Sequence, residues 1–148
     1  PSSKTILGNK ELAKQFGNKN YSYTLHQCGS EEFEPDRNSL DFAFTSPPYF
    51  DTEQYSNEQS QSYIKFKSVL KWKSKFLRQT IKNVHRGLKQ NKFMGLNVAD
   101  VKNYSTFERD TIEIAEDIGF KYLDRFDYAL GSQHDNFKTE PIFIFKKI

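Results

Sequence analysis

The chain has 148 residues, a formal net charge of +3, 36% hydrophobic residues and a single cysteine, Cys28. Its length corresponds to one domain, and a lone cysteine cannot form an internal disulfide, which favours a reducing, cytoplasmic compartment. No apolar run is long enough to span a bilayer, and three scattered histidines with one cysteine lack the spacing of a metal site. We therefore expect a single cytoplasmic domain with no membrane partner and no metal.

The first third of the chain predicts one helix and two strands. Residues 9–17 are expected to form a helix, with Asn9 as its N-cap and Gly17 as its stop. Residues 21–28 predict a strand that ends on Cys28, which we expect to be a buried small side chain. The segments that follow are a turn at 34–39, a buried strand at 40–45 and a polar, mobile loop at 50–62.

The rest of the chain alternates helical and extended patterns. Apolar residues repeat with helical spacing over 62–89, namely Val69, Trp72, Phe76, Ile81, Val84 and Leu88. Asn91 is expected to end this region in a left-handed conformation before a strand at 93–98. A second amphipathic helix at 106–118 closes at Gly119. Two paired strands, 120–130 and 141–147, flank a polar loop at 131–139, and this alternation predicts an α/β fold.

Residues 45–50, Thr-Ser-Pro-Pro-Tyr-Phe, directly follow the apolar run of the 40–45 strand. Two consecutive prolines fix two φ angles and remove two backbone donors, so the loop is stiff and its carbonyls are free to accept hydrogen bonds. The Ser46 hydroxyl and the Pro47 carbonyl can accept from an NH2 group on a planar ring, while Tyr49 covers the ring face. A Pro-Pro turn that merely ends a strand is the alternative interpretation.

Ser46-Pro47-Pro48-Tyr49 after a strand resembles the catalytic loop of the DNA amino-methyltransferases, which transfer a methyl group from S-adenosylmethionine to cytosine N4 or adenine N6. Supporting likeness lies in segments 25–33, 39–44, 50–56, 93–98 and 140–147. The resemblance implies a Rossmann-like methyltransferase sandwich whose mixed sheet ends in an antiparallel strand pair. It also implies catalytic roles for Ser46, Pro47, Pro48 and Tyr49.

The resemblance implies S-adenosylmethionine as the cofactor, with Ser30, Glu31 and Ser46 beside it. Glu31 and Glu32 also fit an ordinary polar turn after a strand. The family's glycine-rich cofactor turn has no counterpart in these residues, and the opening Pro-Ser-Ser resembles the residues just after the family's second strand. We therefore expect a sheet without its first two strands, completed by a second chain or by a missing N-terminal half.

The charge is unevenly distributed. No acidic residue lies between Gln59 and Ala99, and the basic residues there, called the basic segment below, are Lys65, Lys67, Lys71, Lys73, Lys75, Arg78, Lys82, Arg86, Lys89 and Lys92. Such a block can neutralise phosphates, or it can be an ordinary solvated helix face; the absence of acids argues against ordinary charge mixing. The loop after the catalytic turn is the better candidate for contact with DNA, through Tyr55, Tyr63, Lys65 and Lys67.

The sequence thus predicts methylation of a DNA base that leaves the duplex to reach the loop. The 46–49 loop leans toward cytosine N4, but neither the target base nor the recognition sequence is fixed by these residues. Two other classes remain open. One is a methyltransferase that acts on RNA or on a protein side-chain amide, since both use similar Pro-Pro-Tyr loops. The other is a non-catalytic nucleic-acid-binding module that keeps the loop without the cofactor half.

Overall fold

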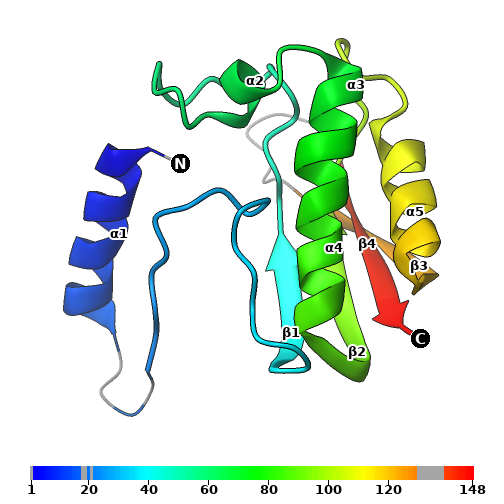
Figure 1. Ribbon diagram of the computed structural model, residues 1–148, viewed down its shortest axis with the longest axis horizontal. Coiled ribbons are helices and arrows are strands. Elements are labelled where there is room, and N and C mark those ends of the chain that lie inside the picture. Colours follow the sequence, from blue (N-terminus) through cyan, green and yellow to red (C-terminus); the bar gives the residue numbers. More distant parts are fainter. Residues whose placement is uncertain (1, 18–19, 21, 130–138) are drawn as a thin grey trace.

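The computed structural model describes residues 2–17, 20, 22–129 and 139–148. Its sheet has the strand order β1-β2-β4-β3 (Figure 1). The strands are β1 (Leu40–Thr45), β2 (Leu88–Asn97), β3 (Phe120–Ala129) and β4 (Thr139–Lys147). β1 runs parallel to β2, whereas β4 runs antiparallel to both β2 and β3. The predicted mixed α/β sheet with a C-terminal antiparallel pair is confirmed.

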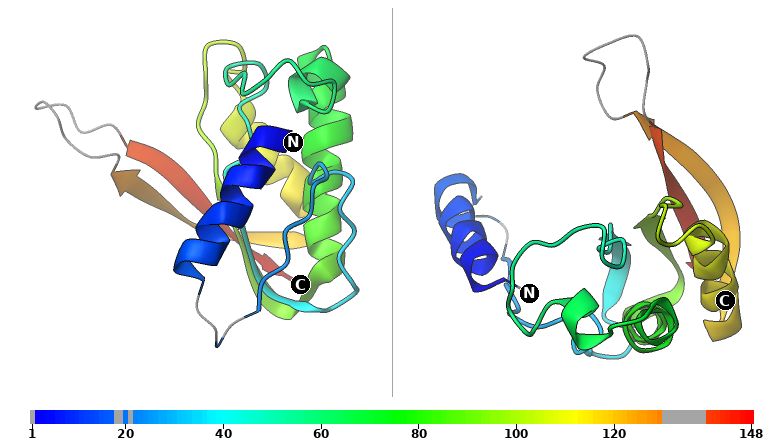
Figure 2. Two further views of the ribbon diagram at one scale, coloured as in Figure 1. Left: turned by 90° about the vertical axis from the view of Figure 1, so that its left-hand side faces the viewer. Right: turned by 90° about the horizontal axis from the view of Figure 1, so that it is seen from above.

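Helices cover one face of this sheet. α3 (Val69–Trp72), the π-helical turn η1 (Lys73–Leu77) and α4 (Arg78–Gly87) run on from one another and connect β1 to β2. α5 (Phe107–Ile118) packs beside α4 and against β3 (Figures 1 and 2). As predicted, α5 ends at Gly119, whose φ of 112° is left-handed. A short helix, α2 (Ser62–Lys65), precedes this group.

The core lies between the helices and the sheet and is rich in aromatic rings. Trp72 and Phe107 are fully buried, with ring centroids 5.6 Å apart in an edge-to-face arrangement. The Trp72 indole Nε1 donates a hydrogen bond to the Ser62 hydroxyl at 3.1 Å, so its polar edge is satisfied. Phe76 is buried as well, so two residues of the predicted helical repeat lie in the core.

The other face of the sheet is open where β1 lies. The prediction that 40–45 is a strand is correct, but it is not buried: Phe42 and Phe44 are 57% and 56% exposed. β1 pairs only with β2, so it forms an edge of the described sheet. The Phe44 ring lies over Gly95, where an added Cβ would come within 2.8 Å of it. The residues are apolar as expected, but no second layer covers them.

Two predictions for the N-terminal region are wrong. The first helix ends at Gly17 as predicted, but it is α1 (Ser3–Phe16), so its N-cap is Ser2 and not Asn9, and none of its residues is buried. It stands apart from the sheet (Figure 1). Residues 22–28 of the predicted 21–28 strand form no strand and are mostly exposed; residue 21 lies outside the described residues. A strand needs a neighbour to satisfy its backbone groups, and none lies beside this segment.

The predicted 62–89 helix is interrupted and shorter. Residues 66–68 separate α2 from α3, and the helical stretch ends at Gly87 because Leu88 already begins β2. Asn91 has the expected left-handed φ of 63° but lies inside β2. There the β1–β2 register shifts, from Leu40 opposite Leu88 to Phe42 opposite Phe93. Asparagine tolerates this conformation, so Asn91 accommodates a bulge rather than ending a helix. Most of the predicted 131–139 loop lies outside the described residues.

Candidate active site

The Ser-Pro-Pro-Tyr loop leaves the carboxyl end of β1 and is anchored in the core. Tyr49 is 8% exposed, and its ring packs edge-to-face on Phe107 at 5.5 Å. Phe50 packs on Trp72 at 6.3 Å. The Phe50 backbone has a φ of 51°, and its N–H donates to the Pro48 carbonyl at 3.0 Å. Prolines and buried rings together fix this loop more firmly than its sequence alone indicates.

The Tyr49 hydroxyl lies among acceptors. It donates to Glu140 Oε2 at 3.4 Å. Burial, followed by the negative charge of Glu140, raises the pKa of Tyr49 to about 12, against an opposing contribution from the Ser46 hydroxyl. The phenol is therefore neutral near neutral pH. Glu140 lies on β4 and is 91 residues from Tyr49 along the chain, so no local sequence pattern links the two.

Two acceptors in the loop remain available. Ser46 is exposed. Within the described part of the chain, no donor is hydrogen-bonded to the Pro47 carbonyl. With the carboxylates of Glu53 and Glu140, which both raise the Tyr49 pKa, these oxygens make the surroundings of the loop rich in acceptors and negative. That environment suits an uncharged ring with an amine donor and disfavours a phosphate.

A cavity of about 310 Å³ lies beside the loop. Ser30 and Glu31 line it from the turn before β1, Pro48 from the Ser-Pro-Pro-Tyr loop and Tyr55 from the segment after it. The amino end of α1 contributes to the wall, as does Cys28. The fold thus gathers residues assigned to cofactor, catalysis and DNA around one cavity, although Ser46, Pro47 and Tyr49 do not line it. Cys28 is half-buried here, not the buried strand residue we predicted.

Glu31 carries an unsatisfied acceptor. Its side chain is 6% exposed, and Oε1 pairs with Lys65 Nζ at 2.5 Å. Oε2 is buried and has no hydrogen-bond partner among the described residues. The carboxylate folds against Gly29, where an added Cβ would lie 2.2 Å from Oε2, so a larger residue there would require the Glu31 side chain to move. A buried carboxylate oxygen without a donor fits a ligand that carries a hydroxyl or an amine.

Helix α4 fixes the turn that presents Ser30 and Glu31. The Ser30 and Thr80 hydroxyls lie 2.9 Å apart, and Asn83 Nδ2 donates to the Ser30 and Glu31 carbonyls, each at 3.1 Å. Thr80 and Asn83 are almost fully buried. Sequence analysis overlooked both. Residues three apart on a helix lie on the same face, so the spacing of Thr80 and Asn83 could have indicated a shared polar contact.

The residues assigned to DNA contact divide into two groups. Tyr55 and Lys67 are exposed. Although Tyr55 is mostly exposed, partial desolvation and a hydrogen bond to Glu53 raise its pKa to about 12. Tyr63 instead donates to the Ser56 carbonyl at 3.0 Å, and Lys65 holds both Glu31 and Glu32, at 2.5 and 2.6 Å. In this conformation Tyr63 and Lys65 serve contacts within the protein.

Most of the basic segment is neutralised by acids from outside it. The pairs are Lys65 with Glu31 and Glu32, Lys73 with Asp110, Arg78 with Asp117, Arg86 with Glu34, and Lys89 and Lys92 with Asp41. The inference that a stretch without acids escapes charge mixing is therefore wrong. Across the residues that the structure describes, four members have no acidic partner: Lys67, Lys71, Lys75 and Lys82.

The described residues contain neither a membrane-spanning helix nor a cluster of metal ligands. No helix there combines the length and apolar character that crossing a membrane requires. No group of three histidine, cysteine or acidic side chains there is placed to hold a metal ion.

Comparison with known proteins shows the fold. No protein-family model matches the sequence, and no curated protein matches it. Among solved structures, a proposed DNA modification methylase from Thermus thermophilus aligns with a TM-score of 0.56 at 18% identity, over 81% of this chain and 50% of that one. A SAM-dependent methyltransferase from Methanosarcina mazei aligns with a TM-score of 0.57 at 13% identity, over 99% and 79%.

A proposed sarcosine dimethylglycine methyltransferase from Galdieria sulphuraria aligns with a TM-score of 0.60 at 12% identity, over 99% and 67%. The similar structures thus include methyltransferases of different described substrates. The chain has the Rossmann-like α/β fold of these proteins, and it spans about half the length of the Thermus protein. The Thermus protein has also been solved in complex with S-adenosyl-L-methionine.

Proposed function

We propose that this chain is the catalytic-loop half of an S-adenosylmethionine-dependent methyltransferase that acts on the exocyclic amine of a flipped DNA base, cytosine N4 or adenine N6. The observation that carries the proposal is the juxtaposition of the 46–49 loop with the Glu31-lined cavity at the carboxyl end of β1. In open α/β sheets, ligands bind at the carboxyl ends of the strands.

The residues around the cavity fit the cofactor. Bound S-adenosylmethionine would supply an electrophilic methyl group on a sulfonium. The unpaired Glu31 Oε2 would accept a hydrogen bond from a ligand hydroxyl or amine. Asn83 holds the backbone of that turn, and Thr80 contacts the Ser30 hydroxyl. The glycine-rich turn would come from outside these 148 residues, on a second chain or an N-terminal half beside the open edge of β1.

The loop would hold the amine. The Ser46 hydroxyl and the Pro47 carbonyl would accept hydrogen bonds from the two N–H groups of the amine. These bonds would direct the nitrogen lone pair out of the base plane. The Tyr49 ring, 8% exposed, would stack on the base only if the loop opens as the base arrives. Placement of amine and methyl in line would provide most of the rate. Acceptors around the loop favour an amine over a phosphate.

The test is methyl transfer by the protein expressed from its native reading frame. Tritiated S-adenosylmethionine is supplied with DNA, RNA or denatured protein, and the labelled product is hydrolysed and identified. We expect N4-methylcytosine or N6-methyladenine from DNA, with the label lost in Ser46→Ala. Label confined to RNA or to protein amides would contradict the DNA assignment. DNA binding without transfer to any acceptor would support a non-catalytic module instead.

A second test measures ligand binding in the cavity and does not depend on methyl transfer. Cys28 is the only cysteine and lines the cavity, so its reaction rate with a thiol reagent reports occupancy. We expect S-adenosylmethionine at millimolar concentration, but not methionine, to slow the reaction. Glu31→Gln should reduce this protection, whereas Glu32→Gln, a change to the neighbouring exposed carboxylate that also pairs with Lys65, should not. Equal protection in both variants would remove Glu31 from the cofactor site.

A further inference from the structure

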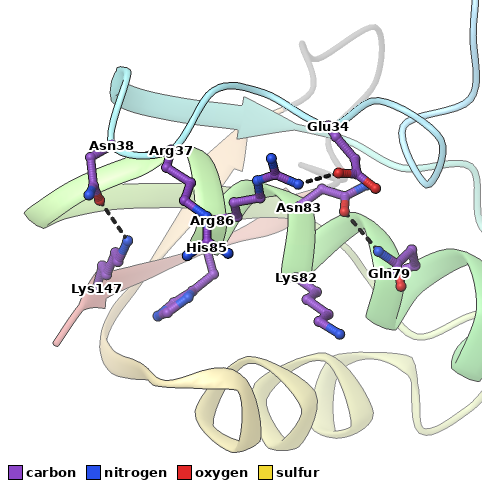
Figure 3. Close-up of a pocket in the computed structure, with 9 residues that line it drawn as sticks. All are labelled: Glu34, Arg37, Asn38, Gln79, Lys82, Asn83, His85, Arg86 and Lys147. Atoms are coloured by element: carbon purple, nitrogen blue, oxygen red, sulfur yellow. Dashed lines mark hydrogen bonds and ion pairs between the residues drawn. The ribbon is translucent and has the colours of Figure 1, made fainter.

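A second cavity lies at the opposite end of the sheet from the catalytic loop. It has a volume of about 450 Å³ and is lined by the turn before β1, by α4 from Gln79 to Arg86 and by the end of β4 (Figure 3). The catalytic loop leaves β1 at its carboxyl end, whereas this cavity includes Arg37 and Asn38, just before the amino end of β1. The two cavities therefore share no lining residue, although Asn83, which lines this one, also holds the turn at Ser30 and Glu31.

The lining of this cavity is strongly positive. Arg37, Lys82, Arg86 and Lys147 contribute four cations, and Glu34 contributes one carboxylate. The excess of three positive charges equals the formal net charge of the whole chain. Arg86 is held by Glu34, and Lys82 points away from Arg37 and Lys147 (Figure 3). Arg37 and Lys147 therefore carry the charge that is open to a ligand.

Lys147 is a buried cation with neutral partners. It is 8% exposed. Its Nζ donates to the Leu88 carbonyl at 2.7 Å and to Asn38 Oδ1 at 3.2 Å, and no carboxylate of the described residues lies within 4 Å of it. A buried charge without a counter-ion is costly. An ammonium group has three donors, so one remains for a further acceptor.

Two further groups lie on the same side of the cavity as Lys147. Figure 3 shows the Arg37 side chain and the His85 ring there. The Arg37 side chain has no hydrogen bond or ion pair to any described residue. His85 Nε2 is buried beside Gly119, whose backbone acts to raise the His85 pKa, and it makes no hydrogen bond of ordinary geometry within the described ranges. Burial, followed by the charge of Lys147, lowers the pKa of His85, so the ring is neutral at physiological pH and can donate or accept one hydrogen bond.

We propose that this cavity binds a phosphate group through Arg37 and Lys147, with His85 as a hydrogen-bonding neighbour. A phosphate offers several acceptor oxygens and two negative charges, which match a guanidinium and a buried ammonium. The phosphate belongs either to a small phosphomonoester or to a nucleic-acid strand. This inference goes beyond the proposed methyl transfer and stands without it, since no residue of the catalytic loop or of the Glu31 cavity is involved.

The test is calorimetric titration of the protein with inorganic phosphate, adenosine monophosphate and a short single-stranded oligonucleotide, each at constant ionic strength. We expect saturable binding of phosphate, and about tenfold weaker binding in Arg37→Gln. Because Arg37 is exposed and makes no described contact, this variant should fold normally. Lys75→Gln, which removes an exposed and unpaired lysine elsewhere, is the matched control and should bind as the wild type does.

The two sources of phosphate give different results. Tighter binding of adenosine monophosphate than of inorganic phosphate supports a phosphomonoester. Oligonucleotide binding that inorganic phosphate displaces, and that Arg37→Gln weakens, supports a nucleic-acid strand. If neither binds, or if Arg37→Gln and Lys75→Gln bind equally, the proposal is overturned. Lys147 would then serve only to satisfy the carbonyl of Leu88, the C-cap of α4.

Discussion

Replacing Tyr49 tests the catalytic loop, and the structure shows how the substitution has to be chosen. Tyr49→Ala removes a ring that is 8% exposed and packs on Phe107. Truncation of a buried aromatic costs about 3–5 kcal/mol of folding stability, so a loss of activity in this variant would not separate catalysis from unfolding. Tyr49→Phe keeps the ring and removes only the hydroxyl and its 3.4 Å bond to Glu140. A hydrogen bond to a charged group contributes about 1.5–3 kcal/mol when its geometry is good, and at 3.4 Å this one is long.

Base stacking on an aromatic side chain contributes about 1–3 kcal/mol. If Tyr49 acts through its ring, Tyr49→Phe should retain most of the methyl transfer and Tyr49→Ala should lose it, roughly 5- to 150-fold at that free energy. Initial rates of tritiated methyl transfer to DNA are measured for both variants, and urea denaturation identifies the conditions in which each is folded. A folded Tyr49→Ala protein with wild-type rates would refute the loop assignment. Tyr49→Phe as inactive as Tyr49→Ala would refute the stacking role.

Three further predictions concern cofactor, DNA and pH. We expect the 148-residue chain alone to bind S-adenosylmethionine very weakly, because it lacks a glycine-rich turn; tight one-to-one binding in calorimetry would show a site built differently. The double variant Lys67→Gln, Lys71→Gln should reduce the slope of log DNA affinity against log salt concentration by about 1.8, because each phosphate contact contributes about 0.9. The paired Lys65 and Lys73 should contribute less to that slope, and an unchanged slope in the first double variant would exclude phosphate contact. Burial acts to raise the pKa of Asp110, but bonds from Lys73 and neighbouring hydroxyls outweigh it and lower the pKa. The carboxylate therefore stabilises the fold above about pH 4 and loses this effect on acidification. Urea midpoints should fall more steeply with acid in the wild type than in Asp110→Asn; parallel curves would contradict the assignment.

Local patterns in the sequence identify much of the fold. Two prolines constrain the loop at 46–49 wherever it lies, and apolar periodicity with a terminal glycine defines α5 and Gly119. These features depend on neighbours a few residues apart, so the sequence carries their whole explanation. The β1 strand and the β3–β4 pair also have clear local patterns, and the fold supplies each of them with a neighbouring strand.

Features that need a distant partner were not predictable. Residues 22–28 have the pattern of a strand, but no neighbouring strand lies beside them. The basic segment has no acids of its own, yet Asp41, Asp110 and Glu31 reach it from elsewhere in the chain. A strand and an ion pair are both stabilised only when a second group is in place.

The candidate site divides in the same way. The sequence by itself determined the chemistry of the loop, because Ser46, the prolines and Tyr49 are contiguous and their hydrogen-bonding capacity follows from their types. Only the tertiary structure decided that Glu140 contacts the Tyr49 hydroxyl and that Asn83 holds the turn at Glu31. Those contacts join residues 91 and 52 positions apart, and chain folding alone sets such distances.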